Sequence, residues 1–144
     1  AALVTNKGSG LHVVSCTVGT VLDLGVKDAN NMGAAMAPAA LETIKAHFAD
    51  LQTGPDDYDL IVTGDLGQLG KELLLELGKR HHLPLGGKLT DCGTLVFDQT
   101  TQDVHSGGSG CGCSAITLCG DLLNKLNSGK LKKILYSQPQ CILY

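Results

Sequence analysis

The feature that most constrains the fold is a short apolar run that leads through a glycine-flanked carboxylate into a leucine-rich segment. Residues 58–63 are apolar and of strand length, Gly64 and Gly67 flank Asp65, and leucines recur at helical spacing over 66–77. A strand that turns at once into a helix is a building unit of layered α/β folds. This segment therefore predicts a sheet with helices packed on it.

The other apolar segments extend this pattern. Helical spacing predicts a helix over 37–51, with Pro38 in its first turn, and another over 115–126 that ends before Gly129. Strand-like composition predicts four further strands, at 2–5, 12–25, 94–98 and 133–136. The expected order is β-β-α-β-α-β-α-β, an α/β layered fold.

Composition supports this class of fold and excludes others. With 43% hydrophobic and 17% charged residues, the 144-residue chain is too apolar to be a disordered tail. Its net charge of −3 argues against a nucleic-acid binder, which would need basic residues to neutralise phosphates. No apolar run approaches the roughly 18 residues that span a bilayer, and no signal peptide is recognisable at Ala1. We expect the chain to begin inside a larger fold, because it has no initiator Met.

Most of the cysteines and histidines are expected to be structural or solvated. The six cysteines are sparse and lack a secretory context, which favours reduced thiols over disulfides. Cys119 lies on an apolar helical stripe and Cys16 lies in the strand predicted at 12–25, and both are predicted to be core residues. His81 and His82 close a helix and are expected to face solvent, and His47 needs no special role.

The first candidate site is the junction at residues 64–67. Ligands of layered α/β folds bind at the carboxyl ends of strands, where helix N-termini offer free N–H groups. Asp65 at such a place could orient a ligand N–H, hold a cation through water, or act as a base. The alternative is that Asp65 only caps the helix that follows.

The second candidate site is the loop at residues 105–114. Four glycines within 107–112 would turn several amides toward a ligand, which suits a carboxylate or a phosphate. The loop matches neither the dinucleotide fingerprint nor the P-loop, because the third glycine and the closing Lys-Ser/Thr are missing. The alternative is a tight turn where a helix packs on the sheet.

Two chemical alternatives use the cysteines of this loop. Cys111 at a helix N-terminus could be a nucleophile with His105 as its base. A zinc site could be formed by Cys92, His105, Cys111 and Cys113, although the Cys-x-Cys spacing is tighter than in usual zinc motifs. We expect no metal site in this chain.

Four segments together resemble one known family. Residues 18–26, 31–40, 58–67 and 107–115 are similar to the stage V sporulation protein AD family of spore-forming Firmicutes, and the resemblance extends from about Ala1 to Leu135. It implies a thiolase-like layered fold with a mixed sheet, of which residues 1–144 would form the carboxyl-terminal half. The amino-terminal half and the final strands would then be missing, and the tail at 136–144 does not look like the family's continuation.

The resemblance also implies a function. The family binds dipicolinic acid, a pyridine with two carboxylates, and takes part in its uptake into the developing spore as the calcium salt. No cofactor is implied, and calcium enters only with dipicolinate. The ligand-binding residues carried over from the two junctions are Thr63, Gly64, Asp65, Leu66, His105, Gly107, Gly108, Ser109, Gly110 and Cys111.

The same resemblance argues against catalysis. Condensing enzymes of the thiolase fold carry a His after the strand that corresponds to 60–63, and an Asn or a second His in the loop that corresponds to 107–111. This chain has Gly64-Asp65 and Gly108-Ser109 at those places. The alternatives left open are an acyl-thioester enzyme that uses Cys111 with His105, and a structural docking module for membrane partners.

The family implies partners and a location. The expected partners are dipicolinic acid and other proteins of the stage V sporulation A operon, some of them integral to the membrane, with no nucleic acid. A homodimer through the missing half is an expectation. The implied location is the spore or forespore, peripheral to the inner spore membrane.

Overall fold

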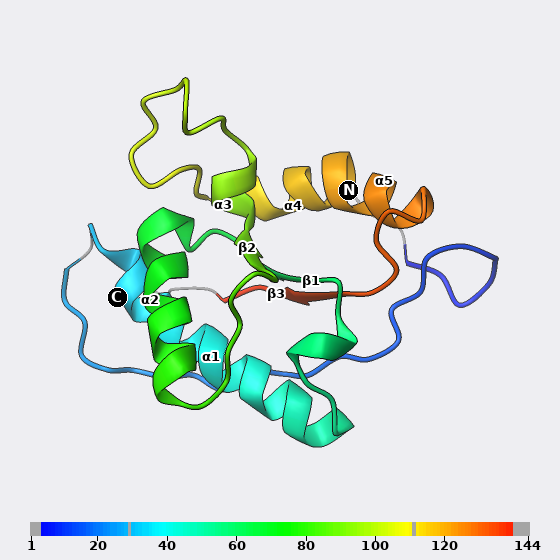
Figure 1. Ribbon diagram of the computed structural model, residues 1–144, viewed down its shortest axis with the longest axis horizontal. Helices are drawn as coiled ribbons and strands as arrows, with labels where there is room; N and C mark the ends of the chain where they lie inside the picture. Colours follow the sequence, from blue (N-terminus) through cyan, green and yellow to red (C-terminus); the bar gives the residue numbers. More distant parts are fainter. Residues whose placement is uncertain (1–3, 29, 111, 140–144) are drawn as a thin grey trace.

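A computed structural model describes residues 4–28, 30–110 and 112–139 and shows a small parallel sheet between two layers of helices (Figure 1). The strands are β1 (Leu60–Thr63), β2 (Leu89–Asp91) and β3 (Ile134–Ser137), in the order β2-β1-β3. Both pairings are parallel, with Thr63 opposite Asp91 on one side and opposite Ser137 on the other. The predicted α/β fold is confirmed, but the prediction of a mixed sheet is wrong for the strands that the structure describes.

Helices cover both faces of this sheet. One face carries α1 (Met32–Leu51) and α2 (Gly67–Arg80), and a 3₁₀ turn, η1 (Pro55–Asp57), leads from α1 into β1. The elements on the other face are α3 (Cys92–Leu95), α4 (Cys113–Thr117), the π-helical turn η2 (Leu118–Leu122) and α5 (Leu123–Asn127).

The alternation of side chains along β1 divides the core into two clusters. Ile61 packs with Leu41 of α1 and Leu74 of α2, while Val62 packs on the opposite face with Cys92 and Leu122. Successive residues of a strand point to opposite faces, so a strand buried on both sides is apolar throughout. This explains why the apolar run at 58–63 predicts a strand from the sequence alone.

The close approach of α1 to α2 depends on two glycines. A side chain on Gly33 would place its Cβ 2.8 Å from the Cα of Gly70, so the two backbones meet where neither residue has a side chain. Leu74 is fully buried on the adjoining face of α2, whereas Leu69, predicted to be in the same stripe, is 44% exposed. Gly70 thus allows close contact between α2 and α1.

The first long helix begins earlier than predicted. Its N-cap is Asn31, whose side chain accepts a hydrogen bond from the Ala34 amide at 3.2 Å, and the helix starts at Met32. Pro38, predicted in the first turn, therefore lies inside the helix. An asparagine cap satisfies an N–H group that has no partner within the helix, and this favours the earlier start.

The described part of the amino-terminal segment, residues 4–28, contains no helix or strand, so the strand predicted at 12–25 is wrong. Residues 2 and 3 of the strand predicted at 2–5 lie outside the described residues, and residues 4 and 5 are not in a strand. β-propensity depends on neighbouring strands, and no described strand pairs with this segment. It follows α1 instead: Thr17 Oγ1 lies 2.8 Å from His47 Nδ1.

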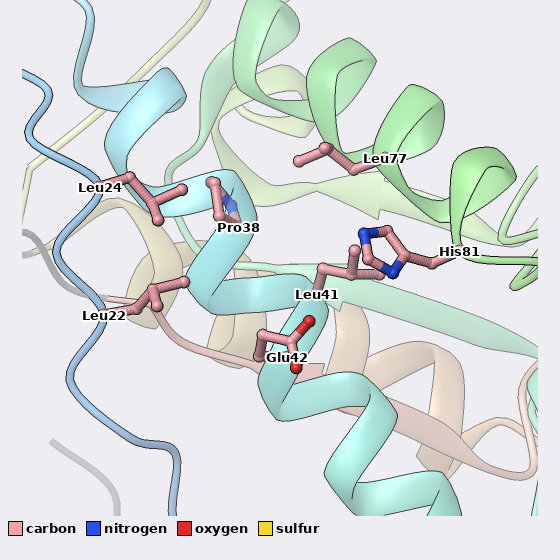
Figure 2. A pocket seen from close by; sticks show the side chains of 7 residues that line it. All are labelled: Leu22, Leu24, Pro38, Leu41, Glu42, Leu77 and His81. Carbon is pink, nitrogen blue, oxygen red and sulfur yellow. The ribbon is translucent and has the colours of Figure 1, made fainter.

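A shallow apolar groove of about 270 Å³ lies where this segment crosses α1 and α2 (Figure 2). Leu22 and Leu24 reach toward Pro38 and Leu41, and His81 closes the far side. The segment is therefore held to the helices by a few side chains and by no regular backbone pairing.

The strand predicted at 94–98 is also wrong, because the chain has already left the sheet by Cys92. Asp91 ends β2 and caps α3, and its carboxylate accepts a hydrogen bond from the Gly93 amide at 2.9 Å. Thr94 Oγ1 donates to the Asp91 carbonyl at 2.8 Å. These bonds favour a helical turn over an extended chain.

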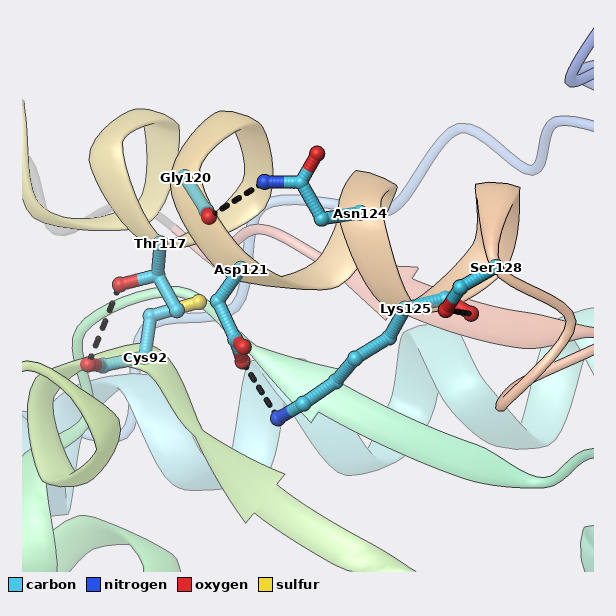
Figure 3. A network of polar contacts seen from close by, with 7 residues as sticks. All are labelled: Cys92, Thr117, Gly120, Asp121, Asn124, Lys125 and Ser128. Carbon is cyan, nitrogen blue, oxygen red and sulfur yellow. Dashed lines mark hydrogen bonds and ion pairs between the residues drawn. The ribbon is translucent and has the colours of Figure 1, made fainter.

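The third long helical segment is widened by the π-helical turn η2 (Figure 3). Asp121 within it pairs with Lys125 of α5 at 2.6 Å, and Asn124 Nδ2 donates to the Gly120 carbonyl at 2.8 Å. A π-turn adds a residue to the helical repeat and so rotates the following side chains. Cys119 is exposed and is not a core residue as predicted, because the buried face of this segment is formed by Cys113, Ser114, Thr117 and Leu122.

Three other sequence expectations have clear outcomes. Cys16 is exposed, because the segment that carries it does not enter the core. His81 and His82 are exposed, as predicted. His47 is buried and contacts Tyr58, with Nε2 2.9 Å from the phenol oxygen, which is a structural contact within the core.

Candidate functional site

The two glycine-rich junctions meet at the carboxyl ends of the strands. The Gly110 amide donates a hydrogen bond to Asp65 Oδ2 at 3.3 Å, across a sequence separation of 45 residues. Asp65 does not cap α2, which contradicts the alternative reading of this residue. The N–H group of Gln68 donates instead to the Ser106 carbonyl, at 2.6 Å. The structure therefore brings together the two loops that the sequence identified separately.

An open cleft of about 470 Å³ lies beside the Asp65–Gly110 contact. The residues that line it come from α1, the two junctions, α4, η2, β3 and the segment that follows β3: Met32, Met36, Asp65, Gly110, Ser114, Ala115, Leu118, Tyr136, Gln138 and Pro139. The Tyr136 hydroxyl donates to Gln138 Oε1 at 3.3 Å. The lining is thus mainly apolar, and a few side-chain oxygen atoms and the Gly110 backbone amide supply its polar groups, as in many small-molecule sites.

Asp65 is the charged residue of this cleft. The described lining residues include no Lys, Arg or His. Burial raises the pKa of the Tyr136 phenol above its usual value, so this group is a neutral hydroxyl near pH 7. The cleft is therefore suited to a cation, to a hydrogen-bond donor, or to a complex that carries its own cation.

A buried carboxylate that no sequence motif identifies organises the site. Asp91 is fully buried, and its Oδ2 accepts from Thr63 Oγ1 at 2.7 Å and from the Leu66 amide at 2.9 Å. Its Oδ1 accepts from the amides of Gly67 and Gly93, both at 2.9 Å. Burial raises the pKa of Asp91, and these four hydrogen bonds oppose that shift. No motif marks this residue, since a single Asp after a short strand is common.

Several glycines of the two loops are explained by loop packing. Gly67 has a φ of +69°, and a Cβ on it would lie 2.7 Å from the Ser106 carbonyl oxygen. A Cβ on Gly93 would overlap the Gly108 carbonyl oxygen, and one on Gly107 would overlap the Gly93 carbonyl oxygen. The tight-turn alternative therefore accounts for part of the cluster. Gly110, with a φ of +99° and open space around it, is the loop glycine that faces the cleft.

The remaining predicted site residues lie at different depths. Thr63 and Leu66 are buried behind the loop, and Gly64 lies against the Gln138 side chain. His105 and Ser109 are exposed and do not line the described cleft. Cys111 lies outside the described residues. Of the ten predicted residues, Asp65 and Gly110 are thus the two that line the described cleft.

The described thiols near the site are poor nucleophiles. Burial, with the Asp91 charge as a lesser cause, raises the pKa of Cys92 to about 12. Burial also raises the pKa of Cys113. Because the thiolate is the reactive form, neither is activated near pH 7. Among the described residues no group of three or more His, Cys, Asp or Glu side chains is arranged to hold a metal ion.

These features define the class of the molecule: an α/β protein in which two strand-end loops frame an open cleft at one edge of a parallel sheet. The comparisons with known proteins then give the family. The family model described as stage V sporulation protein AD matches residues 1–142, and the chain belongs to this family. The match continues past Leu135, where the resemblance in the sequence was expected to end.

One curated relative shows how much of such a protein this chain represents. Stage V sporulation protein AD of Bacillus subtilis (strain 168) is 43% identical over 134 residues. These residues are 93% of this chain and 39% of the relative, so the chain spans well under half of the relative's length. Within the described residues, no helix has the length and apolarity needed to cross a bilayer.

Proposed function

We propose that this chain is part of a non-catalytic sporulation protein that binds dipicolinic acid as its calcium complex and takes part in its uptake into the developing spore. The observation that carries the proposal is the isolated carboxylate of Asp65, hydrogen-bonded to the Gly110 amide in a cleft with no basic lining residue among those described. We also infer a thiolase-like fold, of which this chain forms the carboxyl-terminal half; the parallel sheet between two helical layers supports it.

The charge of the cleft explains why calcium belongs to the ligand. Free dipicolinate carries two negative charges and would be repelled by Asp65. Calcium takes roughly six to eight oxygen-rich ligands, and chelation by one dipicolinate leaves positions open. The Asp65 carboxylate and the Gln138 amide oxygen are of the type that calcium prefers, and the apolar side chains of Met36 and Leu118 suit a flat ring.

The first prediction follows from this charge. Replacing Asp65 with asparagine should weaken binding of calcium dipicolinate by about tenfold, as expected for the loss of a charged ligand. Isothermal titration calorimetry of the wild-type and variant chains measures the effect, with far-UV circular dichroism to confirm folding. Asp50→Asn, at an exposed position near the end of α1, is the matched control for charge and should bind as the wild type does.

Three outcomes would contradict the proposal. Binding of dipicolinate that is as tight in excess chelator as in calcium would show that the cation plays no part. Tighter binding by the Asp65→Asn variant would show that this carboxylate repels the ligand. Absence of heat with folded wild-type protein would remove the ligand assignment itself.

The acyl-thioester alternative is tested through the cysteines. We predict that incubation with an acyl thioester leaves Cys92 and Cys113 unmodified near pH 7, because burial keeps both thiols protonated. Peptide mass spectrometry measures this, and the exposed Cys119 reports on nonspecific acylation. An adduct on Cys111 that disappears in His105→Ala would overturn the non-catalytic proposal.

The proposed partners and location follow from the family. We propose that the protein acts with other proteins of the stage V sporulation A operon, in the spore or forespore and peripheral to the inner spore membrane, and that it dimerises through the part of the relative that this chain does not cover. The docking-module alternative predicts that a pull-down of those proteins is unchanged by Asp65→Asn and by removal of dipicolinate.

A further inference from the structure

We propose that Asp91 is a positioning residue of the cleft: its buried carboxylate joins the two loops and thereby sets the distance between Asp65 and the Gly110 amide. The proposal rests on the proposed function in one respect, because the ligand that it concerns is calcium dipicolinate. Asp91 itself does not line the cleft and is not expected to touch the ligand.

The donors around Asp91 favour an ionised carboxylate and oppose the burial that raises its pKa. Three of its four hydrogen bonds come from backbone amides, at Leu66, Gly67 and Gly93, and a backbone amide can only donate. Each carboxylate oxygen receives at least one of them. Asparagine has the same shape but carries an NH₂ group at one end, so either orientation points a donor at a backbone donor.

One arm of the network leads from Asp91 to Asp65. The amides of Leu66 and Gly67 are the two that directly follow Asp65, so their bonds to Asp91 fix the chain as it leaves that residue. Gly67 then takes a φ that favours glycine and packs against Ser106 of the second loop. The Asp65 carboxylate is thereby held toward the cleft and away from the end of α2.

The second arm leads from Asp91 to Gly110. Asp91 binds the Gly93 amide, and the Gly93 carbonyl accepts a hydrogen bond from the Gly108 amide at 2.8 Å. Two residues further on, the Gly110 amide donates to Asp65. The two arms therefore close a ring, and Asp91 is the member that touches both sides of it.

A spectroscopic test reads the geometry without any ligand. In the ¹⁵N-labelled chain, Asp65→Asn should shift the Gly110 amide resonance, because the acceptor of its hydrogen bond loses its charge. Asp91→Asn should shift the same resonance in the same direction. Asp59→Asn is the matched control: this carboxylate accepts from the amides of Lys132 and Lys133 at the other end of β1, and its loss should leave Gly110 unchanged. A Gly110 resonance unmoved by Asp91→Asn would overturn the proposal.

A double-mutant cycle tests the link to binding. Titration calorimetry with calcium dipicolinate should show that Asp91→Asn alone weakens binding by about tenfold, the size expected for a displaced charged ligand. Added to Asp65→Asn, it should weaken binding no further, because it acts through that residue. Additive losses would mean that Asp91 serves folding alone, a role that does not single out Asp65.

A milder variant keeps the test decisive if Asp91→Asn does not fold. Thr63→Val removes one of the four donors and leaves three, so it should shift Gly110 by a smaller amount in the same direction. If Thr63→Val also leaves Gly110 unmoved, the proposal is wrong. If the wild type fails to bind calcium dipicolinate while Gly110 responds to both variants, the proposed function fails and the positioning role stands.

Discussion

Truncating Leu74 to alanine is expected to lower the free energy of unfolding by about 3 kcal/mol. Leu74 of α2 is fully buried, and it packs with Leu41 of α1 and Ile61 of β1. Its removal loses the transfer free energy of the side chain and leaves a cavity that rigid neighbours fill only in part. Urea denaturation followed by circular dichroism measures the change, and the slope of the transition should stay the same.

Leu69 supplies the control on the same helix. It is 44% exposed, so Leu69→Ala should cost less than about 1 kcal/mol. Equal losses at the two positions would mean that the face of α2 that carries Leu74 is not the buried one.

Replacing Gly93 with alanine is expected to lower the free energy of unfolding by about 2–3 kcal/mol, an effect of overpacking. The added methyl group would overlap the Gly108 carbonyl oxygen. The backbone of residue 93 fixes the position of a Cβ and the carbonyl is itself a backbone group, so neither can rotate away. The α3 turn and the loop that contains Gly108 must then separate, with loss of the hydrogen bond from the Gly108 amide to the Gly93 carbonyl. Thermal and urea denaturation measure the cost, and titration with calcium dipicolinate should show weaker binding as well.

Gly120 is the matched position for this prediction. A Cβ there would meet no atom within 4 Å, and the residue lies in the helical segment, so Gly120→Ala should leave stability unchanged or raise it by roughly 0.5 kcal/mol. If Gly93→Ala behaves like Gly120→Ala, α3 and the loop that contains Gly108 are not in backbone contact.

The parts of the fold that were predictable are those in which local pattern and burial agree. The strand at Leu60–Thr63 is apolar because both of its faces are covered, and the helices that follow carry leucines at a regular spacing. The carboxyl ends of parallel strands lie at one edge, so the meeting of Asp65 with the loop that contains Gly110 could also be anticipated.

The parts that were missed depend on contacts between distant residues. The strand β2 has only three residues and ends in a buried acid, so its composition gives no strand signal. The Val- and Thr-rich segment around Thr17 has the composition of a strand but no described neighbour to pair with. Asp91 becomes recognisable only when the amides of Leu66, Gly67 and Gly93 are placed around it.

The order of the strands has a consequence for how fast the chain folds. The central strand β1 must find β2, with Thr63 bonded to a carboxylate 28 residues away, and β3, where Asp59 binds an amide 74 residues away. Closing such loops costs chain entropy before any pairing energy is gained, and parallel sheets of this kind fold slowly. Until β3 docks, one edge of β1 stays open to pairing with other chains. Newly made protein is therefore most prone to aggregate in the interval before residues near 134 join the sheet.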